Sequence, residues 1–148
     1  MRLFLAHHAD AVGPDVDPRR PLSAPGVASM EQVGRVAAAR GARPDVFWHS
    51  GKLRAKQTAE ILWRACNPLA TVSATRDLQP GDPPMWIRDR LRAEPRDLLL
   101  AGHYPHLPRL LELLLDDQAA EFPQHGMVAL STSDEGETWT EEWRIEAP

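Results

Sequence analysis

The sequence predicts an α/β fold, and more closely a three-layer α/β/α single domain over residues 1–148 with a mostly parallel central sheet. Short runs that are apolar throughout have the character of strands buried on both faces. They alternate with longer segments whose apolar residues recur at helical spacing, and this alternation is typical of parallel sheets covered by helices. Two strand-like segments near the C-terminus flank a turn, which predicts an antiparallel edge hairpin.

The first half of the chain is expected to supply three strands and two helices. Leu3–Ala6 is apolar without interruption, as a fully buried strand is. A Pro-rich loop at 12–21 leads to Ser23, a suitable helix N-cap, and apolar residues then repeat at helical spacing up to Gly41. The remaining elements are a strand at 46–48, a helix at 52–66 that ends before Pro68, and a weak strand at 71–73.

The second half begins with a turn-rich loop at 78–84, followed by a short helix at 85–93. A third buried strand at 97–101 and a strongly apolar helix at 107–115 come next. The terminal hairpin is expected to pair 127–130 with 139–145 across a turn at 134–136. Trp139 and Trp143 are expected on one face of the last strand, where they would cover the edge of the sheet.

Composition and charge exclude several classes of protein. Hydrophobic residues at 43% and charged residues at 26% are ordinary globular values and argue against a disordered chain. Lys and Arg number 17 against 21 Asp and Glu, a net charge of −4 that does not suit a basic nucleic-acid binder. Cys66 has no partner for an internal disulfide, and no apolar run approaches the ~20 residues that span a bilayer. We therefore expect a cytoplasmic protein without nucleic-acid or membrane partners.

Polar residues follow the three best predicted strands directly. The residue pairs at the strand ends are His7-His8, His49-Ser50 and Gly102-His103. Ligands of open α/β sheets bind in the crevice beyond the carboxyl ends of the strands. The sequence therefore predicts a histidine-rich site at this edge of the sheet.

The segment from Ser50 to Ala59 places cations at the start of a helix, at Lys52, Arg54 and Lys56. The helix dipole disfavours cations there by typically ~0.3–1 kcal/mol. Free N–H groups at a helix N-terminus bind anions, so an anion nearby would account for the cations. Arg54 is the candidate phosphate clamp, because a guanidinium binds phosphate through two parallel hydrogen bonds.

These segments together resemble the histidine phosphatase superfamily, and within it the SixA-like phosphohistidine phosphatases. The family motif Arg-His-Gly is matched by His7-His8-Ala9, with His8 at the position that accepts the phosphoryl group. The motif Ser-x-x-x-Arg-Ala-x-Gln-Thr-Ala is matched in full by residues 50–59, and a Gly-His motif by Gly102-His103. Order and spacing agree over about residues 1–131, including Pro21-Leu22-Ser23 with Gly26 and Leu78-Gln79-Pro80.

The resemblance implies a metal-independent phosphatase in which His8 becomes phosphorylated and water then hydrolyses the phosphohistidine. Arg54 and a protonated His103 would neutralise charge on the phosphoryl oxygens. It implies no cofactor and no metal. The substrate would be a phosphorylated protein, such as a phosphotransfer domain, or a small phosphomonoester. The residues expected to bind phosphate are His7, Ser50, Arg54 and Tyr104.

The chain departs from the family pattern at two positions of the first motif, where His7 replaces Arg and Ala9 replaces Gly. A protonated His7 would restore the missing charge, because a neighbouring dianion raises an imidazole pKa. Activity would then fall earlier with rising pH than in relatives that carry Arg. Asp82, in the loop at 78–84, is the candidate general acid, although Asp beside Gly and Pro is also a common turn residue.

Two other functions are kept open. A phosphate-binding protein without turnover would result if the first-motif Arg is indispensable. A metal-dependent hydrolase would draw on imidazole and carboxylate ligands. The residues available for the metal are His7, His8, Asp10, His103 and His106. His125 is expected to be a surface loop residue without a role in the site.

Overall fold

The computed structural model describes residues 1–148, and its elements alternate between strands and helices as the sequence predicts. In chain order they are β1 (Arg2–His7), α1 (Ala24–Ala39), β2 (Val46–His49), α2 (Leu53–Cys66), β3 (Thr71–Ala74), α3 (Pro84–Arg92), β4 (Leu98–Gly102), α4 (His106–Leu115), β5 (Met127–Ser131) and β6 (Thr140–Ile145). None of the four helices has the length and apolar character needed to cross a membrane.

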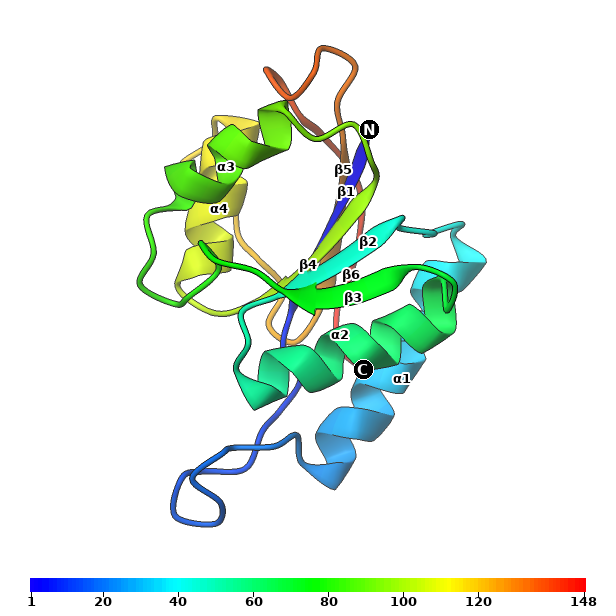
Figure 1. Ribbon diagram of the computed structural model, residues 1–148, viewed down its shortest axis with the longest axis vertical. Coiled ribbons are helices and arrows are strands. Elements are labelled where there is room, and N and C mark those ends of the chain that lie inside the picture. Colours follow the sequence, from blue (N-terminus) through cyan, green and yellow to red (C-terminus); the bar gives the residue numbers. More distant parts are fainter.

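The six strands form one sheet in the order β3-β2-β4-β1-β5-β6 (Figure 1). The first four run parallel, β5 runs antiparallel to β1, and β6 runs antiparallel to β5. The predicted mostly parallel sheet with an antiparallel C-terminal hairpin is confirmed. Strand β1 lies between β4 and β5, so it is paired along both edges.

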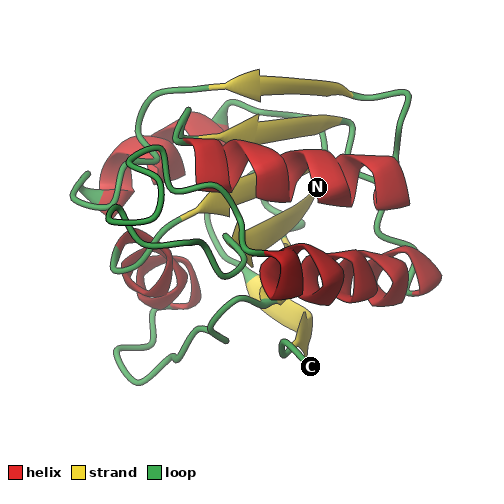
Figure 2. Cartoon of the chain, turned by 90° about the horizontal axis from the view of Figure 1, so that it is seen from below, coloured by secondary structure: helices red, strands yellow, loops and turns green.

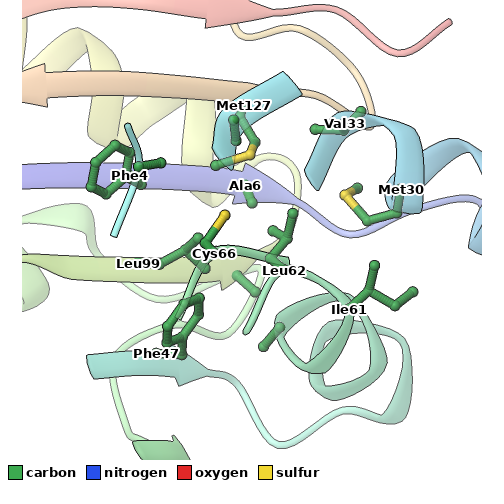
Figure 3. Close-up of a cluster of buried hydrophobic side chains, with 14 of the residues drawn as sticks. Phe4, Ala6, Met30, Val33, Phe47, Ile61, Leu62, Cys66, Leu99 and Met127 are labelled. Carbon is green, nitrogen blue, oxygen red and sulfur yellow. The ribbon is translucent and has the colours of Figure 1, made fainter. Parts of the chain in front are cut away.

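Helices cover both faces of the sheet, which gives the three predicted layers (Figures 1 and 2). The residues of β1 alternate between the two cores: Phe4 and Ala6 join the core beneath α1 and α2, whereas Leu3 and Leu5 join the core beneath α3 and α4. Because both faces are buried, the strand is apolar at every position rather than at alternate ones. The first core also includes Met30, Val33, Phe47, Ile61, Leu62, Cys66, Leu99 and Met127 (Figure 3).

Helix α1 begins where the sequence predicts, at the N-cap Ser23. The Ser23 hydroxyl accepts a hydrogen bond from the Gly26 N–H at 3.0 Å, which satisfies one of the free donors of the first turn. A Cβ atom at Gly26 would lie 2.2 Å from the Asp10 carbonyl oxygen. Glycine at this position therefore allows the start of α1 to lie directly against the segment that follows β1.

The expectation that Trp139 and Trp143 share one face of the last strand is wrong. Trp143 packs against Phe4, with ring centroids 5.9 Å apart, in the core beneath α1 and α2. Trp139 belongs to the core on the opposite face. The pairing of β5 with β6 shifts register between Ala129 and Leu130, and such an irregularity reverses the alternation of side chains along a strand.

Candidate active site

The polar strand ends come together at one edge of the sheet. His7 of β1 is paired with Gly102 of β4, and His49 of β2 with Ala101 of β4, so the three strands end at nearly the same level. The residues that follow, His8, Ser50 and His103, are therefore neighbours at this edge, as predicted. His49 is not part of the group, because its Nδ1 accepts the Gly51 N–H at 3.0 Å and its ring lies near Lys56 and Glu60 of α2.

His8 is oriented with one ring nitrogen free. Its Nδ1 lies 2.8 Å from the Ala9 carbonyl oxygen, which can only accept, so Nδ1 carries the proton and Nε2 keeps a lone pair. No protein group bonds to Nε2, and this nitrogen is not enclosed. Burial is the main cause that lowers the pKa of His8 to about 4; the Ala9 hydrogen bond acts against this lowering, and the Arg54 charge adds to it. A neutral imidazole with a free lone pair is a suitable nucleophile.

The segment 50–59 fixes the position of His8 from α2. The Thr58 hydroxyl accepts the Ala9 N–H at 3.1 Å and donates to the Arg54 carbonyl at 2.8 Å. The Gln57 side-chain oxygen accepts the Leu22 N–H at 2.7 Å, which fastens the loop before α1. Ala9 is not among the residues with positive φ, so the alanine in place of the usual glycine imposes no strain.

Two arginines without a carboxylate partner act electrostatically on the imidazoles. The Nε of Arg54 is buried and has no hydrogen-bond acceptor, and the charge of Arg54 lowers the pKa of His7, His8 and His103. Arg20 lies in the loop before α1, donates from Nε to the Val12 carbonyl at 3.1 Å, and lowers the pKa of His8 and of Arg54. Two unpaired guanidinium groups whose charges act on the same imidazole favour an anion nearby. Arg20 was not expected from the sequence, because it lies in an irregular loop.

His103 is 1% exposed and shares a hydrogen bond of 2.6 Å between its Nε2 and the Ser50 hydroxyl. Its Nδ1 is buried without a partner. Burial, followed by the effects of His8 and Arg54, lowers the pKa of His103 to about 3. Burial and the nearby Arg54 charge thus disfavour a protonated His103, and its protonation beside a bound phosphoryl group stays a prediction.

His7 is neutral as well. It is 4% exposed, and its Nδ1 accepts the backbone N–H of His125 at 2.8 Å. Burial, followed by the effects of His8 and His125, lowers the pKa of His7 to about 2. A backbone donor and two neighbouring imidazoles thus oppose the protonation of His7, and its protonation by a bound dianion stays a prediction.

His125 belongs to the site, contrary to the expectation of a surface residue without a role. It lies just before β5, and β5 runs antiparallel to β1, so this loop meets the edge where β1 ends. The His125 Nδ1 donates to the His8 carbonyl at 2.7 Å, and its ring stacks on that of His7 at 4.8 Å and 6°. The position of His125 follows from the antiparallel pairing of β5 with β1, for which the sequence has no local signal.

Tyr104 contacts the histidines of the site, whereas Asp82 does not. Tyr104 stacks on the other face of His7, with ring centroids 4.3 Å apart, and its hydroxyl donates to the Phe122 carbonyl. The Asp82 carboxylate accepts the Gln79 N–H at 3.0 Å within its own turn. No hydrogen bond or ion pair joins Asp82 to the histidines.

The residues that geometry offers to a metal ion are His7, His8 and His125, whose potential ligand atoms lie within 4.8 Å of one another. Two other residues that the sequence offers as metal ligands, Asp10 and His106, are not available to this group. Asp10 accepts from the Ser23 hydroxyl at 2.7 Å beside the start of α1. His106 is fully buried, with both ring nitrogens unpaired.

No family model and no curated protein matches the chain. Solved structures do match. The protein histidine phosphatase SixA complexed with tungstate has a TM-score of 0.88 at 21% identity, over 99% of this chain and 97% of that one. The putative phosphohistidine phosphatase SixA from Agrobacterium tumefaciens has a TM-score of 0.82 at 23% identity, with the same two coverages.

A mycobacterial glucosyl-3-phosphoglycerate phosphatase, solved in complex with VO3, has a TM-score of 0.73 at 16% identity, over 99% of both chains. The chain therefore has the fold of the SixA-type and phosphoglycerate-mutase-like histidine phosphatases, as the sequence motifs predict.

Proposed function

We propose that this protein is a metal-independent phosphatase in which His8 forms a phosphohistidine intermediate. The observation that carries the proposal is the orientation of His8: Nδ1 is bound to the Ala9 carbonyl, and Nε2 is free on a ring whose pKa is lowered by the charges of Arg54 and Arg20. The fold shared with SixA supports it, as does the full match of residues 50–59.

The reaction has two steps. The Nε2 lone pair of His8 attacks phosphorus, so that an N–P bond forms while the bond to the leaving atom breaks, and the leaving group departs with that electron pair and takes up a proton. Water then attacks phosphorus, the N–P electrons return to Nε2, and inorganic phosphate is released. Arg54 and Arg20 would neutralise charge on the equatorial oxygens, and this is the main requirement of phosphoryl transfer.

The leaving group decides between the two substrate classes. Asp82, bonded within its own turn, remains the candidate general acid for an alkoxide leaving group. A phosphoramidate leaving nitrogen takes up a proton more readily than an alkoxide, so it needs less help. We therefore favour a phosphohistidine protein, such as a phosphotransfer domain, over a small phosphomonoester as the substrate.

A phosphate-binding protein without turnover is the second candidate. The observation that favours it is the neutral His7 at the position of the family arginine, which removes one permanent charge from the transition state. Loss of one such donor costs about 10²–10³ in rate in other enzymes.

Phosphate release from a phosphohistidine-bearing phosphotransfer domain, measured in the presence of a chelator, tests the proposal. The matched variant is His8→Asn, because the asparagine amide can still donate to the Ala9 carbonyl but offers no Nε2. We expect release by the wild type, an acid-labile phosphoryl label on the wild type alone, and tungstate binding by both. Tungstate binding without release by the wild type would establish the binding-only candidate. Release by His8→Asn would contradict a nucleophilic role for His8.

A further inference from the structure

The tautomer of His7 is fixed by a backbone donor. The His125 N–H points at the His7 Nδ1 from 2.8 Å, so this nitrogen must hold a lone pair. In a neutral imidazole the single proton then lies on Nε2. A proton on Nδ1 would face the His125 N–H head-on in a buried position, which costs the hydrogen bond and adds repulsion.

The ring of His7 has little freedom to leave this arrangement. Tyr104 stacks on one face at 4.3 Å and His125 on the other at 4.8 Å. Both neighbours are held in turn: the Tyr104 hydroxyl is bound to the Phe122 carbonyl, and the His125 Nδ1 to the His8 carbonyl. The stacked rings and the two backbone carbonyls thus fix the direction of the His7 Nε2–H.

The charges around His7 also keep it neutral. The groups that act on it are His8 just after β1, His103 after β4, His125 before β5 and Arg54 of α2. Each of them disfavours a positive charge on His7, and Tyr104 contributes an uncharged ring. No carboxylate forms an ion pair with His7.

We infer that His7 serves as a neutral hydrogen-bond donor to the bound oxyanion through Nε2–H, and that the backbone N–H of His125 is the group that selects this tautomer. The His7 Nε2 has no partner in the protein and is not enclosed, and the His7 ring lies 4.5 Å from that of the proposed nucleophile His8. His125 is thus a positioning residue. The inference rests on the proposed function for the identity of the ligand as a tetrahedral oxyanion.

The same geometry disfavours a metal ion on the three histidines. A metal bound at the His7 Nε2 would need the lone pair there, so the proton would have to move to Nδ1. That position already receives the His125 N–H. The three histidines therefore offer an anion one N–H donor, on His7. They offer a cation a free lone pair on His8 and His125 at most.

Two measurements that do not depend on turnover test the inference. The first is ¹⁵N NMR of histidine-labelled wild-type protein, with and without tungstate, between about pH 6 and 8. We expect the ring whose signals disappear in His7→Gln to show the Nε2–H tautomer and to remain neutral across this range. A His7 ring that titrates in this range, shows the Nδ1–H tautomer, or shifts on addition of zinc overturns the inference.

The second measurement compares tungstate affinity in His7→Gln and His7→Asn. The glutamine amide can place an N–H donor near the position of Nε2, whereas the shorter asparagine amide reaches only the position of Nδ1. We expect tungstate to bind about tenfold to a hundredfold more tightly to His7→Gln, as expected for a hydrogen bond to a charged group. Equal affinities, or tighter binding by His7→Asn, overturn the inference.

The two proposals fail in different ways. A protein that binds tungstate with the expected tautomer but releases no phosphate contradicts the proposed phosphatase and leaves the role of His7 intact. A protein that releases phosphate through His8 but whose His7 titrates near neutral pH contradicts only the inference.

Discussion

The buried histidines make the stability of the fold sensitive to mild acid. Burial is the largest cause of the lowered pKa values of His7, His8 and His103, which fall to about 2, 4 and 3 from an ordinary value of 6.5. Below pH 6.5 the unfolded chain takes up protons at these rings that the folded protein excludes. Their contribution to stability is therefore fully present above that pH and is lost as the pH falls towards the folded-state values.

The expected loss is large. Each ring removes about 1.4 kcal/mol of unfolding free energy per pH unit while the unfolded state is protonated and the folded state is not. The three together remove about 4 kcal/mol per unit between about pH 6 and 5. Burial lowers the pKa of His49 and His106 as well, which acts in the same direction. A domain with about 5–15 kcal/mol of stability would lose much of it within one or two pH units.

Urea unfolding followed by tryptophan fluorescence at a series of pH values measures this slope. His7→Gln is the matched variant, since it removes one buried imidazole, and its slope should be lower by about 1.4 kcal/mol per pH unit. A free energy of unfolding that stays constant between about pH 7 and 5 would refute the reasoning. So would an unchanged slope in the variant.

Three further substitutions give distinct outcomes. Thr58→Val leaves the Ala9 N–H without its acceptor and should destabilise the fold by about 1–3 kcal/mol, with faster amide exchange at Ala9; Thr58→Ser, which keeps the hydroxyl, should retain the slow exchange. Arg54→Lys replaces a bidentate donor by a point charge and should lower kcat/KM about 10²–10³-fold with an unchanged circular dichroism spectrum; a loss below tenfold would exclude the clamp. Gly26→Ala puts a Cβ 2.2 Å from the Asp10 carbonyl oxygen, so its melting temperature should fall by several degrees in a thermal scan; an unchanged melting temperature would mean that the two segments can separate without cost.

The parts of the fold that depend on local pattern could be predicted from the sequence. Apolar runs predicted β1, β2 and β4 of the parallel part, and Ser23 predicted the start of α1. The residues 50–59 predicted both the helix and its cationic start. These features are determined by residues close together in the chain, so that one segment contains the whole signal.

Features set by contacts between distant segments could not be predicted in the same way. His125 reaches His7 across more than a hundred residues, because β5 runs antiparallel to β1. The neutral state of His7 and His103 depends on burial, which the sequence around them does not reveal. The faces of Trp139 and Trp143 depend on a local shift of register that has no signature in the alternation of residues.

The central position of β1 has a consequence for how the protein is made. This strand is synthesised before both of its partners, because Leu3 pairs with Leu98 of β4 on one side and Leu130 of β5 on the other. At translation rates of about 5–20 residues per second, the nascent chain presents an apolar segment without its partners for about 5–20 seconds. Pairings this distant also slow refolding, because the loop must close before the contact can form. Newly made protein is therefore expected to be a client of chaperones that bind short apolar segments.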